Sequence, residues 1–196
     1  MCASKRHRPL RLPHRTHRIT PQSSAGHRRS RDFISTLTYP EVGATAGELP
    51  AGYHHVRASR VIGNGRDSFE SASAALLSWR MHEHAGVRKL SGPEVATTGR
   101  DVAFRWLVVR FECRVISVVD EPDRRGFTYG TLAKHPECGE ERFVVEIDPQ
   151  TQVVAATITA FSKPSGWVIR AGGPVPRFVQ AFMTRRYLSS LEASAS

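Results

Sequence analysis

The feature that most constrains the fold is a change to period-two alternation of apolar and polar residues from about residue 94 to 162. Phe143 and Val145 share one parity in this region, whereas Arg142 and Glu146 share the other. Because successive side chains of a strand point to opposite faces, alternating runs separated by turn residues predict an antiparallel sheet. One face of that sheet should rest on the core.

Two helices are expected beside the sheet. The first spans about 67–85, between a capping-box-like pair, Asp67 and Glu70, and a terminal Gly86. The second spans about 175–191 and follows a segment broken by proline and glycine. The apolar side chains that cluster on one face of the second helix are Val175, Phe178, Val179, Phe182 and Met183. An α+β protein is therefore predicted.

The chain divides by composition into a tail, a lead-in and one domain. Residues 1–32 hold nine of the 28 Lys and Arg but one of the 18 acidic residues, which leaves 19 basic against 17 acidic side chains elsewhere. With almost no large apolar residues, this segment is predicted to be disordered. It is interpreted as a nucleic-acid-binding arm, an organelle transit peptide or an inert extension. Residues 33–52 are expected to form an ordered lead-in, and residues 53–192 a single domain.

The cysteines and the hydropathy indicate where the protein resides. Cys2, Cys113 and Cys138 are sparse, odd in number and without a Cys-x-x-Cys pair. That pattern fits a reducing compartment better than a secreted disulfide framework. No apolar run approaches the roughly 20 residues of a membrane span, and no secretory signal is visible. A cytoplasmic protein is predicted.

Five strings together resemble one family, the domain-of-unknown-function 1990 family. They are TYPEVGAT (38–45), LPAGYHH (49–55), GFTYGTLAKHPECGEERF (126–143), AFSKP (160–164) and TRRYL (184–188). The resemblance runs from about residue 39 to 191 and is most specific in the string 126–143. Residues 1–32 are not covered.

The family's element order is similar to the helix-grip fold of START and Bet v 1-like proteins. That resemblance implies a curved antiparallel sheet wrapped around a long C-terminal helix, often with an apolar ligand between the two. A likeness of fold does not by itself supply a function.

Two charged residues are the main candidates for a site. Glu141 has the parity of the buried residues that follow it, and burial raises the pKa of a carboxyl group, which is how a general acid is made. The alternative is a surface position at the strand end or behind a bulge. Arg186 projects onto the apolar face of the second helix, where it would bind Glu141 or an acidic ligand head group. Otherwise its stem packs and its guanidinium reaches solvent.

The remaining candidates are aromatic residues and one polar turn. Tyr129 is expected to face the interior, as a hydrogen-bond donor to a ligand or as an ordinary core tyrosine. His135, Cys138 and Glu140 are residue types that bind zinc, but no second cluster completes a ligand set, so a hairpin turn capped by polar side chains is the better interpretation. We therefore predict no metal and no cofactor.

The leading hypothesis is a protein that binds a small apolar or amphipathic molecule between the sheet and the last helix. The predicted apolar walls are Phe104, Trp106, Phe127, Tyr129, Phe178 and Phe182, with Glu141 and Arg186 as polar anchors. The alternative is an enzyme of the cyclase, isomerase or hydrolase type, with Glu141 or His135 as acid or base and Tyr129 as donor. A third hypothesis is nucleic-acid binding, which we expect only through the tail.

Overall fold

A computed structural model describes residues 37–133, 135–166 and 177–196. Its main feature is one antiparallel sheet of seven strands in the order β1-β7-β6-β5-β4-β3-β2. The strands are β1 (His54–Asn64), β2 (Val87–Ser91), β3 (Asp101–Trp106), β4 (Val109–Asp120), β5 (Arg124–Thr131), β6 (Glu137–Ile147) and β7 (Val153–Pro164). The helices are the short 3-10 helix η1 (Ala44–Ala46), α2 (Arg66–Leu77), α3 (Arg80–His84) and α5 (Arg177–Ser194).

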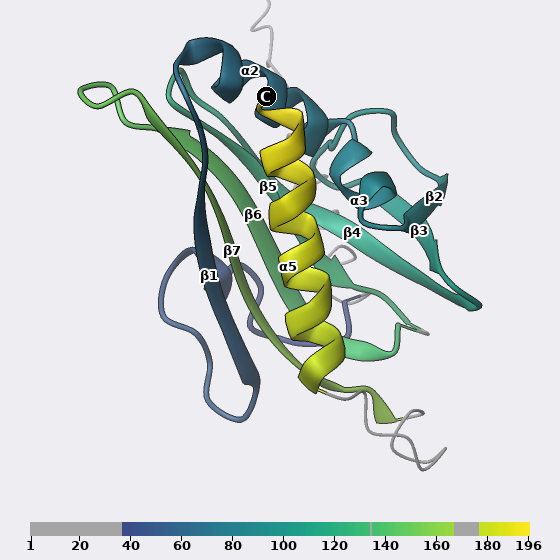
Figure 1. The fold of residues 1–196 in the computed structure, drawn as a ribbon. Coiled ribbons are helices and arrows are strands. Elements are labelled where there is room, and N and C mark those ends of the chain that lie inside the picture. The colour runs from purple at the N-terminus through teal and green to yellow at the C-terminus, as the bar shows by residue number, and fades with distance from the viewer. Residues whose placement is uncertain (1–36, 134, 167–176) are drawn as a thin grey trace, which may run out of the picture.

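The sheet curves around the long C-terminal helix. Figure 1 shows α5 lying across one face of the strands, with α2 and α3 beside it on the same face. The alternation read from the sequence decides which side chains lie beneath these helices: Phe143, Val145 and Ile147 of β6 are buried in the main core. The predicted fold class, an antiparallel sheet wrapped around a C-terminal helix, is thereby confirmed.

The first predicted helix is in fact two helices. Trp79 has a left-handed backbone conformation, with φ 68°, and breaks the chain between α2 and α3. Its indole is fully buried and donates a hydrogen bond of 3.0 Å to the carbonyl of Pro93. Burial of a large aromatic side chain offsets the strain of this conformation. The predicted capping box does not form, because α2 begins after Gly65 with no side-chain cap.

The inner face of α5 differs from the predicted one. Tyr187, Leu188 and Leu191 are buried against the sheet, whereas Phe182 is 47% exposed. The buried stripe continues through Thr184 and Ala195 at helical spacing. The prediction that Phe182 faces the interior was wrong, because the N-terminal apolar residues used to orient the helix do not lie on that stripe. Of the helices in the described ranges, none has the length and apolar character needed to cross a bilayer.

The outer face of the sheet carries a second, smaller core. Residues 37–53 pack there over the strand ends, and Phe161 of β7 meets Tyr39 and Tyr53 edge to face at ring-centroid distances of 5.4 and 5.0 Å. Near this end, β6 and β7 are therefore covered on both faces. The tail, residues 1–32, lies outside the described residues.

Candidate functional site

The β5–β6 hairpin brings two of the predicted site residues together. Tyr129 and Glu141 are directly opposite each other across the two strands, and both face the helices. The Tyr129 hydroxyl donates a hydrogen bond of 3.0 Å to Oε2 of Glu141. A one-residue slip of β6 against β5 would send Glu141 to the outer face, away from Tyr129, so the register of the hairpin creates this pair.

Glu141 is a carboxyl group in a mostly aromatic interior, yet it is only partly buried. Burial raises its pKa to about 7, the hydrogen bond from Tyr129 opposes the shift, and the nearby carboxylate of Glu137 adds to it. A group with such a pKa is present in both protonation states at neutral pH. It can therefore accept or donate a proton there.

His82 on α3 extends this pair into the core. Its Nε2 lies 3.4 Å from the Tyr129 hydroxyl, at the long end of hydrogen-bond distances, and its ring stacks on Phe104 with centroids 4.8 Å apart. The side chain is fully buried, which lowers its pKa to about 3 and keeps the imidazole neutral. Its Nδ1 is buried without a hydrogen-bond partner among the described residues. His82, Tyr129 and Glu141 thus form a polar row that ends at Glu141.

His82 was not among the site residues predicted from the sequence. It lies near the end of the first expected helix and follows Trp79 by three residues. Residues three apart on a helix share a face, and a large apolar side chain such as Trp79 is expected on the buried one. That spacing was the available signal, and in the structure the two rings lie 5.6 Å apart.

Tyr187 of α5 closes the same site from above the sheet. Its ring lies 5.1 Å from that of His82 and 5.6 Å from that of Phe143. Burial raises its pKa well above the usual range, and the charge of Glu141 adds to the shift. The site is therefore made by three separate parts of the chain: α3, the β5–β6 hairpin and α5.

A second carboxyl group lies on the same face of β6. Glu137 is four residues before Glu141, and its Oε1 accepts a hydrogen bond of 2.6 Å from the Gln180 amide of α5. The same amide also donates to the Ser162 hydroxyl of β7. Burial raises the pKa of Glu137, although the Gln180 bond opposes the shift. The interior polar groups of β6 are therefore acidic.

The other predicted wall residues are divided between core and surface. Phe104 and Phe127 are fully buried and Trp106 is partly buried against the core. The rings of Phe127 and Trp79 lie 4.9 Å apart, so these aromatics pack on one another. Phe182 lies largely exposed, as described above, and the side chain of Phe178 is outside the described part of the chain.

Arg186 does not pair with Glu141, contrary to the prediction. Its Nε donates a hydrogen bond of 2.7 Å to the carbonyl of Ala85, at the end of α3, and its guanidinium lies over the ring of Phe182 at 5.6 Å. The residue is exposed. Because Tyr187 of α5 faces the core, the adjacent Arg186 points away from the core to the exposed rim of the site. Its hydrogen bond to Ala85 there links α5 to the end of α3.

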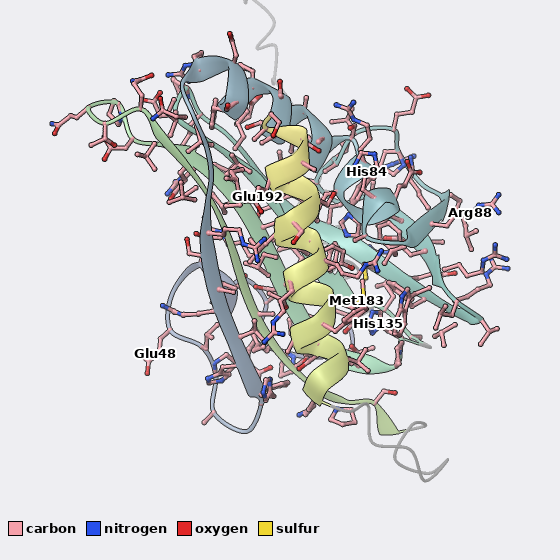
Figure 2. The ribbon with its side chains drawn as sticks, viewed as in Figure 1. Glu48, His84, Arg88, His135, Met183 and Glu192 are labelled. Carbon is pink, nitrogen blue, oxygen red and sulfur yellow. The ribbon has the colours of Figure 1, made fainter. Side chains whose placement is uncertain are left out.

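The three residues of the polar turn do not converge on a common point. His135 accepts a hydrogen bond of 3.0 Å from the Glu137 amide, the Cys138 thiol donates one of 2.7 Å to the Thr38 carbonyl, and Glu140 points to the outer face. Within the described ranges, no group of three or more His, Cys, Asp or Glu is arranged to hold a metal. Burial lowers the pKa of His135 to about 4, so this imidazole is neutral at pH 7. Figure 2 labels His135 below α3 in the view.

Glu140 is instead the centre of a clamp on the outer face. Its two oxygens accept hydrogen bonds from the Tyr39 hydroxyl (2.9 Å), the Gly43 amide (2.7 Å), the Thr45 amide (3.0 Å) and the Thr45 hydroxyl (2.5 Å). Opposite Glu140, Gly130 leaves the space for Tyr39, since a Cβ there would lie 2.1 Å from the phenol oxygen. This clamp binds the lead-in to the sheet.

A surface groove of about 660 Å³ lies elsewhere, beside α2. It is lined by Glu70, Ala74, Leu77, Ser78, Arg80, Val95, Asp120 and Arg125. Arg125 bridges Glu70 and Asp120 within it, so its principal charges neutralise one another. None of its lining residues belongs to the row of His82, Tyr129 and Glu141.

Comparison with known proteins supports the family resemblance. A protein of Deinococcus radiodurans, described as a UPF0548 protein, is 34% identical over 172 residues, which are 78% of this chain and 79% of that relative. A UPF0548 protein of Dictyostelium discoideum is 30% identical over 135 residues, and the match spans 62% of its length, less than two thirds.

A solved structure shows the same fold. It is that of a hypothetical protein from Helicobacter pylori, which is 12% identical, with a TM-score of 0.57, over 76% of this chain and 92% of that one. At this identity the likeness concerns the fold alone. The family model described as "Domain of unknown function (DUF1990)" matches residues 38–190. From that match and the Deinococcus relative, the chain belongs to the DUF1990 family.

Proposed function

We propose that the protein binds a small apolar or amphipathic molecule between the sheet and α5, with Glu141 and Tyr129 holding its polar group. One observation carries the proposal: Glu141 is a partly exposed residue whose carboxyl has a pKa of about 7 inside an aromatic shell, and among the described residues one hydroxyl, that of Tyr129, bonds it. Stability alone favours an apolar residue at such a position, because a buried carboxyl must be desolvated. Departures of this kind are expected at functional or strained sites.

The groups around Glu141 indicate the chemistry of the ligand. Glu137 and Glu141 both face the interior, while Arg186, the expected partner of an acidic head group, lies at the rim. A second acidic group would be repelled by these carboxyls. The ligand should therefore present a hydrogen-bond donor, such as a hydroxyl or a protonated amine, on an apolar body.

The test is native mass spectrometry of the full chain purified gently from cells. We expect an excess mass that disappears on denaturation, and its loss in Glu141→Gln and Tyr129→Phe. The matched control is Glu146→Gln, which changes an exposed carboxyl on the same strand and should keep the ligand. A ligand retained equally by all three variants would refute the proposed site.

An enzymatic role of the same site is the second candidate, favoured by the pKa of Glu141. A carboxyl with a pKa near 7 is matched to general acid-base catalysis at neutral pH, and the Tyr129 hydroxyl is placed to donate beside it. If the extracted molecule is converted on incubation with the protein, Glu141→Gln should abolish conversion and Glu141→Asp should retain part of it. A molecule that is bound but not converted would argue against an enzyme and support a carrier.

A reducing compartment, such as the cytoplasm, suits the thiols. Cys113 and Cys138 are both buried and unpaired by disulfide. Burial raises the pKa of Cys113 well above its usual value, which keeps it as an unreactive thiol. Fractionation of cells that express the intact protein tests this placement.

A further inference from the structure

The turn between β3 and β4 contains residue types that are unusual in a tight hairpin. Its two loop residues are Leu107 and Val108, whereas tight hairpins favour glycine, asparagine and aspartate. Leu107 adopts φ 52°, a conformation uncommon outside glycine, and the two side chains are 74% and 93% exposed. Two large apolar side chains thus lie in water at the tip, next to the partly buried Trp106.

Three arginines form a row across the base of this tip. Arg88, Arg105 and Arg110 are directly opposite one another on β2, β3 and β4, and all three are exposed. Like charges in such cross-strand positions destabilise a sheet. Among the described residues, no carboxylate forms an ion pair with any of the three. The next row carries a single acid, Glu112, opposite Ala103.

The hairpin stands apart from the rest of the fold. Figure 1 shows the β3–β4 hairpin extending away from α5 at the end of the sheet where β2 is the edge strand. Figure 2 shows the Arg88 side chain pointing outward on this side of the molecule. The apolar tip and the basic row are therefore presented together, and none of the described helices packs over them.

We propose that the β3–β4 hairpin docks on a bilayer that carries anionic lipid headgroups. Arg88, Arg105 and Arg110 contact the headgroups, and Leu107 and Val108 enter the boundary between headgroups and acyl chains. This combination of basic and apolar side chains is typical of interfacial membrane binding, in which burial of apolar side chains and attraction to anionic lipid act together. Nucleic acid would bind the arginines but has no use for the two exposed aliphatic side chains, so lipid accounts for both observations.

The first experiment is co-sedimentation of the full chain with phosphatidylcholine vesicles that contain about 30% phosphatidylserine. Changing Arg88, Arg105 and Arg110 together to Gln should weaken binding about fivefold per arginine. Changing Leu107 and Val108 together to Ser should weaken it about tenfold or more. The matched controls are Arg185→Gln on the exposed side of α5 and Val61→Ser, an exposed residue of β1 at the opposite edge of the sheet.

A second measurement separates docking by the hairpin from attraction through the basic N-terminal residues, which all these variants retain. Tryptophan fluorescence of Leu107→Trp should be quenched by acyl-chain brominated lipid, after subtraction of the wild-type signal, and that of Val61→Trp should not. The triple arginine variant should be at least as stable as wild type, because the repulsion within the row is relieved.

Several outcomes would overturn the proposal. They are no sedimentation with the anionic vesicles, equal sedimentation of wild type and hairpin variants, and an unquenched Leu107→Trp on bound vesicles. Tight binding of an oligonucleotide that depends on the three arginines but not on Leu107 or Val108 would assign the surface to nucleic acid instead.

Discussion

Glu140 and Glu141 are neighbours on β6, yet they sit in opposite environments. Glu140 faces the outer side of the sheet, is 2% exposed and accepts four hydrogen bonds from the lead-in. Glu141 faces the helices, is partly exposed, and accepts one hydrogen bond from the described part of the chain, that of Tyr129. The pleat alone separates them, since successive residues of a strand point to opposite faces.

The difference separates a structural carboxylate from the carboxyl that we propose binds a ligand. A buried charge contributes to folding when donors replace the water it loses, and Glu140 has such donors on both oxygens. Glu141 has one donor, together with the repulsion of Glu137, so the folded protein raises its pKa rather than satisfying its charge. A ligand with a hydrogen-bond donor would give the Glu141 carboxyl a second hydrogen bond beside that of Tyr129.

The largest expected effect is that of removing Glu140. Glu140→Ala leaves the Tyr39 and Thr45 donors buried without an acceptor and should lower the free energy of unfolding by about 3–5 kcal/mol. Urea unfolding at pH 7 measures the change. The control, Glu146→Ala, removes an exposed carboxyl of the same strand and should stay within about 0.5 kcal/mol of wild type. A loss below about 1 kcal/mol for Glu140→Ala would contradict the clamp.

Glu141 should affect stability through pH. Its pKa rises from 4.5 to about 7 on folding, so between these values the folded state holds the proton more tightly than the unfolded chain. The resulting stabilisation, at most about 3 kcal/mol, is present at the acid end of this window and is lost as the pH rises through 7. Glu141→Gln should abolish this dependence.

The measurement is urea unfolding of wild type and Glu141→Gln at pH 5 and pH 8. His82 and His135 act in the opposite direction, since burial holds the pKa of each below its unfolded value and the protein loses stability as the pH falls below about 6.5. The difference between wild type and variant isolates Glu141, because both histidines are common to the two. Parallel pH curves would show that Glu141 keeps an ordinary pKa.

The two tyrosines that bond these carboxyls give a smaller test. Tyr39→Phe removes one of the four hydrogen bonds to Glu140 and should cost about 1.5–3 kcal/mol, as measured by urea unfolding.

Tyr129→Phe removes a hydrogen bond that lowers the pKa of Glu141, so that pKa should rise further. Side-chain carboxyl NMR titration measures it. An unchanged or lower pKa would show that the Tyr129 hydroxyl does not stabilise the carboxylate.

The smallest effect is expected at Arg186. Arg186→Ala removes one partly buried hydrogen bond between α5 and the end of α3 and should cost about 0.5–1 kcal/mol. Because the guanidinium lies at the rim, the variant should leave the pKa of Glu141 unchanged in the same NMR titration. A higher pKa in the variant would restore the pairing of Arg186 with Glu141 that the sequence suggested.

The alternation of inward and outward side chains could be read from the sequence because it is a local property of each strand, whatever the arrangement of the strands in space. It gave Tyr129 and Glu141 the inner-face parity that the structure shows, although a surface position was the alternative for Glu141, and the family resemblance implied the order of elements. The position of Arg186, which was the expected partner of Glu141, could not be read from that pattern. It depends on which side of α5 faces the sheet, and in the structure Tyr187 faces inward and Arg186 is exposed.

By itself, the sequence determined the sheet, the C-terminal helix and the shared face of Phe143, Val145 and Ile147 in β6, because these follow from local periodicity. Tertiary structure alone decided that His82 completes the row with Tyr129 and Glu141, and that Glu140 is clamped by a segment about 100 residues earlier in the chain. The backbone break at Trp79 and the cover that residues 37–53 lay over the outer face are long-range packing events. Burial, and with it the chemistry of each carboxyl, depends on what packs against a residue rather than on its neighbours in sequence.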